Sequence, residues 1–457
     1  LILNSMIFKR KLYNKLLAWK QQAAGTKALL IEGARRIGKS TLVEEFAKSE
    51  YRSYLLIDFN KISDSVISAF NNYMNDLDTF FLILSSEYGV KLYPKESIII
   101  FDEIQQFPKA RQAIKYLVAD GRFDYIETGS LISIKENVKD ITIPSEERAL
   151  SMYPMDFEEF AWAIGEEPLM AYIRQCFDKK EPLEQGLHAK AMLLFRQYMI
   201  VGGMPKSLSA YLESNRSFEM ADMEKRDILT LYRNDIMKIR SGYRSSVLSI
   251  FDQIPAFLSR SERRVLMNSI EKGASFPKYH DTFFWLSDSM IANECFNCSD
   301  PNVGLSLNED RTYVKCYMGD TGLLISHTFD ENEISDGELY REILLGKLSV
   351  NEGMFYENVI AQMLVAAGHK LYFYTRYNEE KHRNDMEIDF ILSNHSKLKY
   401  KIFPIEVKSN DKYTIRSLTR FNETFHQRIG ESYVIHPKNL NVKEGVVYLP
   451  AYMTFCL

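Results

Sequence analysis

The chain has 457 residues, enough for about three domains at the usual ~150 residues each. Hydrophobic residues make up 46% and charged residues 26%, and Lys plus Arg (57) nearly balance Asp plus Glu (61), which leaves a net charge of −4. These values exclude a disordered or collagen-like chain. No apolar run approaches the ~18 residues of a membrane span, so we expect no membrane contact, and five sparse cysteines favour a cytoplasmic location.

Short apolar runs alternate with amphipathic segments in the first third of the chain. The amphipathic segments, such as 41–48 and 110–119, carry apolar residues three and four apart, which is typical of helices. The apolar runs predict strands at 28–31, 54–57, 97–101 and 123–126. This alternation predicts an α/β fold with a parallel sheet covered by helices on both faces.

A phosphate-binding loop is predicted where the first strand ends. The sequence there matches G-x-x-x-x-G-K-[ST] between a strand and a helix. Its backbone N–H groups and the helix N-terminus attract phosphate oxygens, Lys39 is expected to reach the β- and γ-phosphates, and the Ser40 hydroxyl to ligate Mg²⁺. The candidate nucleotide-binding residues are Gly33, Ala34, Arg35, Arg36, Ile37, Gly38, Lys39, Ser40 and Thr41.

Two carboxylates follow the strand at 97–101. Asp102 stands where a group near bound Mg²⁺ is needed, and Glu103 where a carboxylate can activate an attacking water. Two solvated acids at a strand end are the plainer interpretation. Coupled to the upstream loop, however, the pair indicates a P-loop NTPase that hydrolyses nucleoside triphosphate, with Lys39 and Glu103 as the catalytic side chains.

Three more polar residues are candidate sensors of the nucleotide. Thr128 and Ser130 follow another short strand and can contact the γ-phosphate, although a plain turn explains them equally well. Arg148 is a candidate arginine finger or subunit contact, although an ordinary surface ion pair is the commoner role.

Beyond residue 150, the expected secondary structure changes twice along the chain. Helices are expected at 157–160, 189–199 and 220–237, followed by helices at 261–270 and 279–291 and a strand at 312–317, an order that suits a winged-helix-like unit. A helix over 355–367 then precedes strands expected at 370–376, 387–392, 400–408 and 432–435. The expected domains are 1–150 (P-loop), 151–240 (helical lid segment), 241–335 (winged-helix-like) and 336–457 (α/β).

The last domain contains the pattern D-x₁₆-E-x-K. Residues two apart on a strand share a face, so Glu406 and Lys408 project together, and Asp389 lies beside Glu406 if the two strands pair. Asp389 and Glu406 can hold a second Mg²⁺ for phosphodiester cleavage, with Glu357 as a further ligand or an orienting group. A charged strand rim without catalysis is the plainer interpretation. Lys and Arg outnumber acids over 395–420, which favours DNA as a partner.

The ordered set of motifs resembles bacterial and archaeal AAA-type predicted ATPases that end in a restriction-endonuclease-like domain of the PD-(D/E)xK type. The matching segments are 33–41, 101–105, 128–130, 153–160, 202–205, 315–323, 355–358 and 405–409. The resemblance implies ATP rather than GTP as the nucleotide and a nuclease-like C-terminal end. It makes self-association plausible as well, because such sites are often completed by a neighbour's arginine.

Two functions therefore remain open. In one, ATP-driven rearrangement controls DNA cleavage at Asp389, Glu406 and Lys408. In the other, the C-terminal domain is catalytically inactive and recognises a protein or nucleic acid as an ATP-dependent binding switch. Cys295 and Cys298 form a lone C-x-x-C pair, which is read as two ordinary cysteines rather than a zinc site because no second pair lies nearby.

Overall fold

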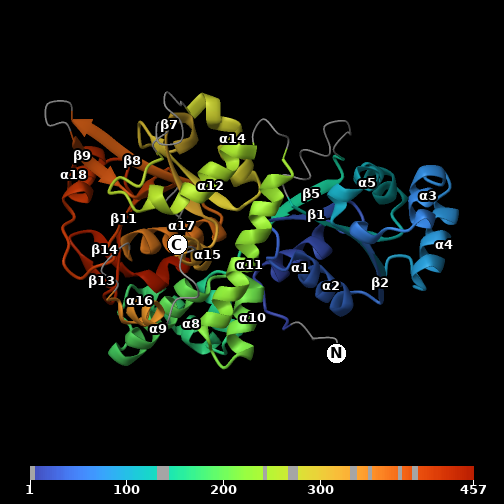
Figure 1. Cartoon of the computed structure of the whole chain (residues 1–457), viewed down its shortest axis with the longest axis horizontal. Helices are drawn as coiled ribbons and strands as arrows, with labels where there is room; N and C mark the ends of the chain where they lie inside the picture. The colour runs from blue at the N-terminus through green and yellow to red at the C-terminus, as the bar shows by residue number, and fades with distance from the viewer. Residues whose placement is uncertain are drawn as a thin grey trace. The chain divides into compact units, whose positions relative to one another are not determined.

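A computed structural model describes residues 6–130, 144–239, 244–265, 276–329, 337–347, 352–378, 383–393 and 400–457. These residues form two compact units, labelled by element in Figure 1. The first unit contains the chain up to Tyr153 together with Asp288–Met290, and the second contains the remainder. In the part of the chain so described, no helix is long and apolar enough to cross a membrane.

The first unit is built around a parallel five-stranded sheet with the order β2-β3-β4-β1-β5. Its strands are β1 (Ala28–Glu32), β2 (Ser53–Asp58), β3 (Ser97–Asp102), β4 (Asp124–Gly129) and β5 (Glu147–Ser151). Its helices are α1 (Leu12–Gln22), α2 (Lys39–Glu50), α3 (Asp64–Asn72), α4 (Leu77–Tyr88) and α5 (Pro108–Asp120). The predicted parallel α/β fold is confirmed, and all four predicted strands are present.

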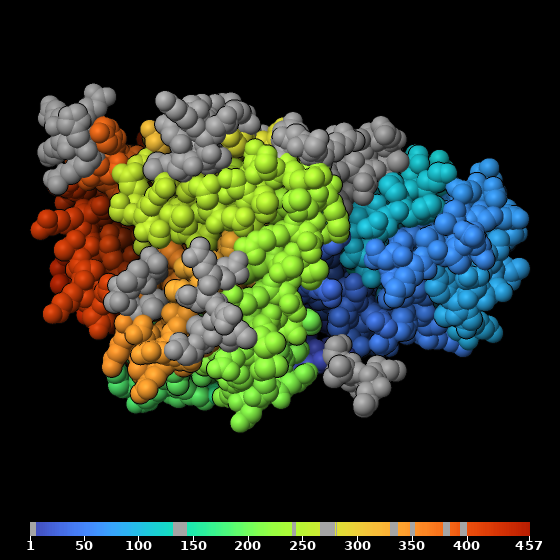
Figure 2. Space-filling model, viewed as in Figure 1, coloured from blue at the N-terminus to red at the C-terminus, as the bar shows by residue number. Residues whose placement is uncertain are grey.

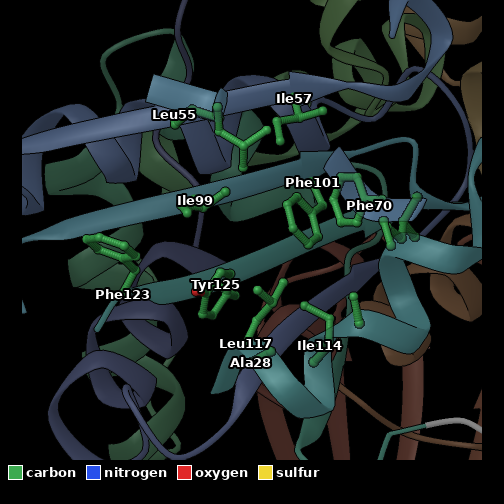
Figure 3. Packing of buried hydrophobic residues seen from close by; sticks show 14 of the residues in the cluster. Ala28, Leu55, Ile57, Phe70, Ile99, Phe101, Ile114, Leu117, Phe123 and Tyr125 are labelled. Atoms are coloured by element: carbon green, nitrogen blue, oxygen red, sulfur yellow. The ribbon is translucent and has the colours of Figure 1, made fainter. Parts of the chain in front are cut away.

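One hydrophobic core covers a face of this sheet beneath α3, α4 and α5. Alternate residues of the strands supply it, such as Leu55 and Ile57 from β2 and Ile99 and Phe101 from β3 (Figure 3). All of β3 is buried, because a central parallel strand is covered on both faces. The core therefore fixes the carboxyl ends of the strands, where the motif residues follow.

Helices make up the first half of the second unit. They are α7 (Phe157–Ala163), α8 (Glu167–Lys179), α9 (Gln185–Val201), α10 (Pro205–Glu213), α11 (Phe218–Met237), α12 (Arg244–Leu258) and α14 (Phe276–Asp288). A capping box starts α7, in which the Asp156 carboxylate accepts from Glu159 N (2.9 Å) and the Glu159 carboxylate accepts from Asp156 N (3.3 Å). The yellow-green surface of α11 and α12 forms a broad strip of this unit in Figure 2.

Two sheets complete the second unit, with the orders β7-β6-β8-β9 and β10-β11-β12-β14-β13. Their strands are β6 (Ala292–Cys298), β7 (Glu309–Met318), β8 (Leu371–Asn378), β9 (Arg383–Ile388), β10 (Phe390–Ser393), β11 (Ile402–Val407), β12 (Ser432–His436), β13 (Asn441–Lys443) and β14 (Val446–Pro450). The accompanying helices are α15 (Thr321–Thr328), α16 (Glu338–Leu345), α17 (Glu352–Ala366) and α18 (Arg416–Phe425).

The middle of the chain differs from a separate winged-helix-like unit over 241–335. β6 and β7 pair antiparallel, but β6 also pairs in parallel with β8, where Cys295 lies beside Leu371. The boundary expected at 335 therefore runs through one sheet. Of the expected helix at 261–270, residues 261–265 form a turn and irregular chain, and the rest lie outside the described residues.

Two glycine-containing segments of the second unit, 202–203 and 320–322, pack directly against each other in its interior. Asp320 accepts a hydrogen bond from Gly203 N at 2.6 Å and another from Gln362 Nε2 at 3.1 Å. A Cβ added to Gly322 would lie 2.6 Å from Gly202 Cα, so only glycine allows these two segments to approach. Packing alone therefore accounts for the glycines at 202–203 and 322.

Candidate functional site

The predicted phosphate loop lies between β1 and α2, at the carboxyl edge of the parallel sheet. Arg36 (φ 67°) and Gly38 (φ 91°) adopt left-handed conformations that turn the loop back over the start of α2. Gly33 packs against the Met152 carbonyl, and an added Cβ would lie 2.4 Å from that oxygen. The loop thus has the strand–loop–helix context that its sequence motif requires.

The ammonium group of Lys39 closes the loop on itself. Lys39 Nζ donates to the carbonyl oxygens of Gly33 (2.9 Å) and Ala34 (2.8 Å), and the side chain is buried. Burial lowers the pKa of this ammonium group to about 8, although the carboxylates of Glu103 and Asp102 oppose the shift. The positively charged end of Lys39 is therefore held within the loop by two backbone carbonyl oxygens.

Ser40, Asp102 and Thr128 meet beside this loop. Ser40 Oγ donates to Asp102 Oδ1 at 2.7 Å, and the Thr128 hydroxyl donates to the same oxygen. Thr128 Oγ1 in turn accepts a hydrogen bond from Glu103 N at 3.3 Å. The strand ends of β3 and β4 thus bring together the predicted metal residues and one predicted sensor.

Glu103 is held by a residue that the sequence did not single out for a role. Its backbone adopts a left-handed conformation (φ 56°), which is uncommon for a residue other than glycine. Gln105 is buried, and its Nε2 donates to Glu103 Oε2 at 2.5 Å. Gln105 therefore fixes the direction of the carboxylate that was predicted to activate water.

Arg10 is a second residue that sequence reasoning missed. Its Nη1 donates to the carbonyl of Ile37 in the loop (2.9 Å), and its Nη2 donates to the carbonyl of Tyr153 (2.6 Å). The buried guanidinium group thus ties the phosphate loop to the end of the first unit. No local pattern marks Arg10, because its partners lie far along the chain.

The remaining candidate sensors are Ser130 and Arg148. Ser130 is buried just after β4. Arg148 is exposed on the edge strand β5, in register with Leu29 of β1. Leu29 precedes Gly33 by four residues, so Arg148 lies about 13 Å along the sheet from its own loop at ~3.3 Å per residue. The structure does not bring Arg148 into the nucleotide site of its own chain.

In the second unit, Asp389, Glu406 and Lys408 lie close together. β10 and β11 pair antiparallel, and Asp389 Oδ2 accepts a hydrogen bond from Val407 N at 2.8 Å. Lys408 Nζ pairs with Glu406 Oε1 at 2.6 Å. Burial raises the pKa of the Glu406 carboxyl to about 7, a shift that Lys408 opposes and Asp389 reinforces.

The fourth candidate, Glu357, is fully buried on α17 and is surrounded by donors. It forms ion pairs with Lys315 (3.2 Å) and Arg263, and the Tyr317 hydroxyl donates to it. Each of its carboxylate oxygens therefore has a protein partner.

Lys315 contacts several of these carboxylates, although no sequence motif marks it as a site residue. Its Nζ lies 3.6 Å from Glu387 Oε1 and 3.9 Å from Asp389 Oδ1, in addition to Glu357. Over the residues that the structure describes, no group of three or more His, Cys, Asp or Glu side chains is arranged to hold a metal ion. Cys295 and Cys298 are buried free thiols.

Comparison with known families assigns the first unit. Residues 25–161 match a family described as an AAA domain. Together with the parallel sheet and the loop, this match makes the first unit an AAA-type P-loop ATPase domain. Residues 192–333 and 352–453 match two families, each described as a domain of unknown function. No curated protein matches the sequence.

Similar solved structures include several archaeal and bacterial proteins. A Walker-type ATPase of Pyrococcus abyssi is 15% identical with a TM-score of 0.41, covering 70% of this chain and 96% of that chain. The RuvB Holliday junction branch migration motor of Thermotoga maritima is 12% identical (TM-score 0.28; 62% and 89% covered). Cdc6p of Pyrobaculum aerophilum is 11% identical (TM-score 0.28; 76% and 97% covered).

Proposed function

We propose that the first unit binds and hydrolyses ATP in a Mg²⁺-dependent reaction. One contact carries the proposal: the Ser40 hydroxyl lies 2.7 Å from Asp102 Oδ1, beside the loop that holds Lys39. A hydroxyl and a carboxylate are the protein groups that hold Mg²⁺ alongside nucleotide phosphates in P-loop proteins. The residues present therefore fit Mg²⁺, which would neutralise the charge that develops on the phosphates.

We assign phosphate binding, water activation and nucleotide sensing to the other residues of the site. Lys39 exchanges the carbonyls of Gly33 and Ala34 for the β- and γ-phosphates, while the loop N–H groups bind the same phosphates. Glu103, oriented by Gln105, polarises the attacking water. Thr128 bridges Asp102 and the Glu103 backbone, so it is placed to respond to the γ-phosphate.

Two substitutions test this assignment. Lys39→Ala should abolish ATP binding, because the loop loses the cation that meets the phosphates. Glu103→Gln should preserve binding and lower kcat by about 10²-fold or more, the usual contribution of a general base. Calorimetry with ATP or GTP gives the affinity, and phosphate release with or without EDTA gives the turnover and its dependence on Mg²⁺.

Lys48→Ala is the matched control, because Lys48 lies exposed on the same helix and forms surface ion pairs with Glu44 and Glu45. It should alter neither binding nor turnover. Equal ATP affinity in the wild type and Lys39→Ala would refute the assignment.

For the second unit we propose nucleotide-controlled binding of DNA rather than cleavage. The resemblance implies a nuclease, but Lys315 lies beside Glu357 and Asp389, two of the carboxylates assigned to cleavage, which favours the binding switch. Lys412 and Arg416 are exposed near Lys408 along the chain and offer phosphate contacts.

Fluorescence anisotropy with duplex DNA tests this role in the presence of ATP or ADP. We expect the affinity to differ between the nucleotides, to fall with added salt, and to be lost in Lys412→Glu/Arg416→Glu. Lys443→Glu, on the exposed strand β13, is the control for a charge reversal elsewhere on this unit. Identical weak binding in all variants, whichever nucleotide is present, would rule out DNA as the partner.

A further inference from the structure

We propose that the carboxylate cluster of the second unit holds the ammonium group of Lys315 as its resident cation and takes no divalent metal ion. The cluster consists of Glu357, Glu387 and Asp389. The proposal deepens, and rests on, the proposed binding role of the second unit, because it gives the physical reason why a nuclease-like set of residues would not cleave DNA.

The first observation is the position of the lysine. Lys315 Nζ lies 3.2 Å from Glu357 Oε1, 3.6 Å from Glu387 Oε1 and 3.9 Å from Asp389 Oδ1. The three acids come from α17, from β9 and from the residue just after β9, so the ammonium group occupies the point on which they converge. Mg²⁺ or Ca²⁺ would need carboxylate oxygens at about 2.0–2.6 Å around that same point.

The second observation is that burial and strand pairing hold the Lys315 side chain at this position. Its side chain is 1% exposed, and its strand, β7, pairs with β6, where Cys295 is its partner in register. The Nζ atom also lies 5.1 Å from the centre of the Phe373 ring. Moving the lysine aside would leave its charge buried without these partners, which is strongly unfavourable.

The third observation is that the acids already have other partners. Glu357 also pairs with Arg263 and accepts from the Tyr317 hydroxyl. Asp389 Oδ2 accepts from Val407 N at 2.8 Å. A metal ion at this point would have to displace these donors as well as the ammonium group, so Glu357, Glu387 and Asp389 do not fit a shared divalent metal ion.

Mn²⁺ titration of the full chain without nucleotide, followed by electron paramagnetic resonance, tests the proposal. We expect the wild type to show no Mn²⁺ binding that depends on Asp389, and Lys315→Met to gain at least about tenfold in Mn²⁺ affinity. The double variant Lys315→Met/Asp389→Asn should lose that gain, because it removes one of the freed ligands.

Two results would overturn the proposal. One is Mn²⁺ binding by the wild type that disappears in Asp389→Asn, or plasmid nicking with Mg²⁺ or Mn²⁺ that disappears in Asp389→Ala. The other is a folded Lys315→Met chain with no gain in Mn²⁺ affinity. If Lys315→Met does not fold, the comparison of the wild type with Asp389→Asn and the nicking assay decide alone.

These outcomes are independent of the proposed function. Metal binding at Ser40 and Asp102 would be insensitive to Asp389→Asn, and the test of ATP hydrolysis uses Lys39 and Glu103. A failure to bind DNA would remove the proposed partner without changing the Mn²⁺ result.

Discussion

His436 is a single buried residue whose charge affects the stability of the second unit. It is 3% exposed at the end of β12, and its Nδ1 pairs with the Tyr413 hydroxyl at 2.7 Å. Burial lowers the pKa of the imidazole to about 4; a backbone hydrogen bond with Asn439 and the charge of Asp411 oppose the shift, and Lys438 and His188 add to it. The folded unit therefore favours the neutral ring.

This preference predicts a loss of stability in acid. As pH falls below the ordinary value of about 6.5, the unfolded chain binds the proton first, so the contribution of His436 is complete above pH 6.5 and is lost as pH falls towards 4. A shift of this size amounts to on the order of 3 kcal/mol at ~1.4 kcal/mol per unit. Urea unfolding at pH 7 and pH 4.5 should show a smaller pH dependence in His436→Gln than in the wild type.

His426→Gln supplies the control for that measurement, because His426 is exposed just after α18. It should keep the pH dependence of the wild type. If His436→Gln and the wild type lose equal stability between the two pH values, the imidazole does not cause the effect.

At the scale of elements, a strand could be predicted from the sequence where a run of apolar residues marks it. β3 was predicted because three consecutive isoleucines form a strand that is buried on both faces. β5 (Glu147–Ser151) was missed because it is an edge strand with exposed residues and no apolar run. β6 was missed as well, since its polar residues break the apolar pattern although most of the strand is buried.

The residues of the candidate sites likewise fall into those that a local sequence pattern marks and those that it does not. The phosphate loop could be predicted because its residues are contiguous between one strand and one helix. Arg10, Gln105 and Lys315 could not, because their positions depend on contacts that appear only when the chain folds. Lys315, for example, meets Glu357, which lies 42 residues further along the chain, and no spacing rule connects them.

At the scale of the whole molecule, the question is whether one chain completes its own ATPase site. Arg148 is exposed on the edge strand β5 and lies too far along the sheet to reach the phosphate loop of its own chain. An arginine supplied by a neighbouring chain can stabilise the charge that develops on the transferred phosphate. We therefore expect Arg148 to act at the phosphate loop of a second copy of this chain.

A mixing experiment tests this expectation. Arg148→Ala should bind ATP like the wild type but turn it over about 10³-fold more slowly, a typical effect of removing such an arginine. Lys39→Ala has an intact Arg148 but no functional loop, so an equimolar mixture of the two inactive variants should regain turnover at the loops of the Arg148→Ala chains. Phosphate release should also rise more steeply than protein concentration. Full activity of Arg148→Ala alone would leave Arg148 as an ordinary surface residue, and an inactive mixture would exclude its action in a second copy.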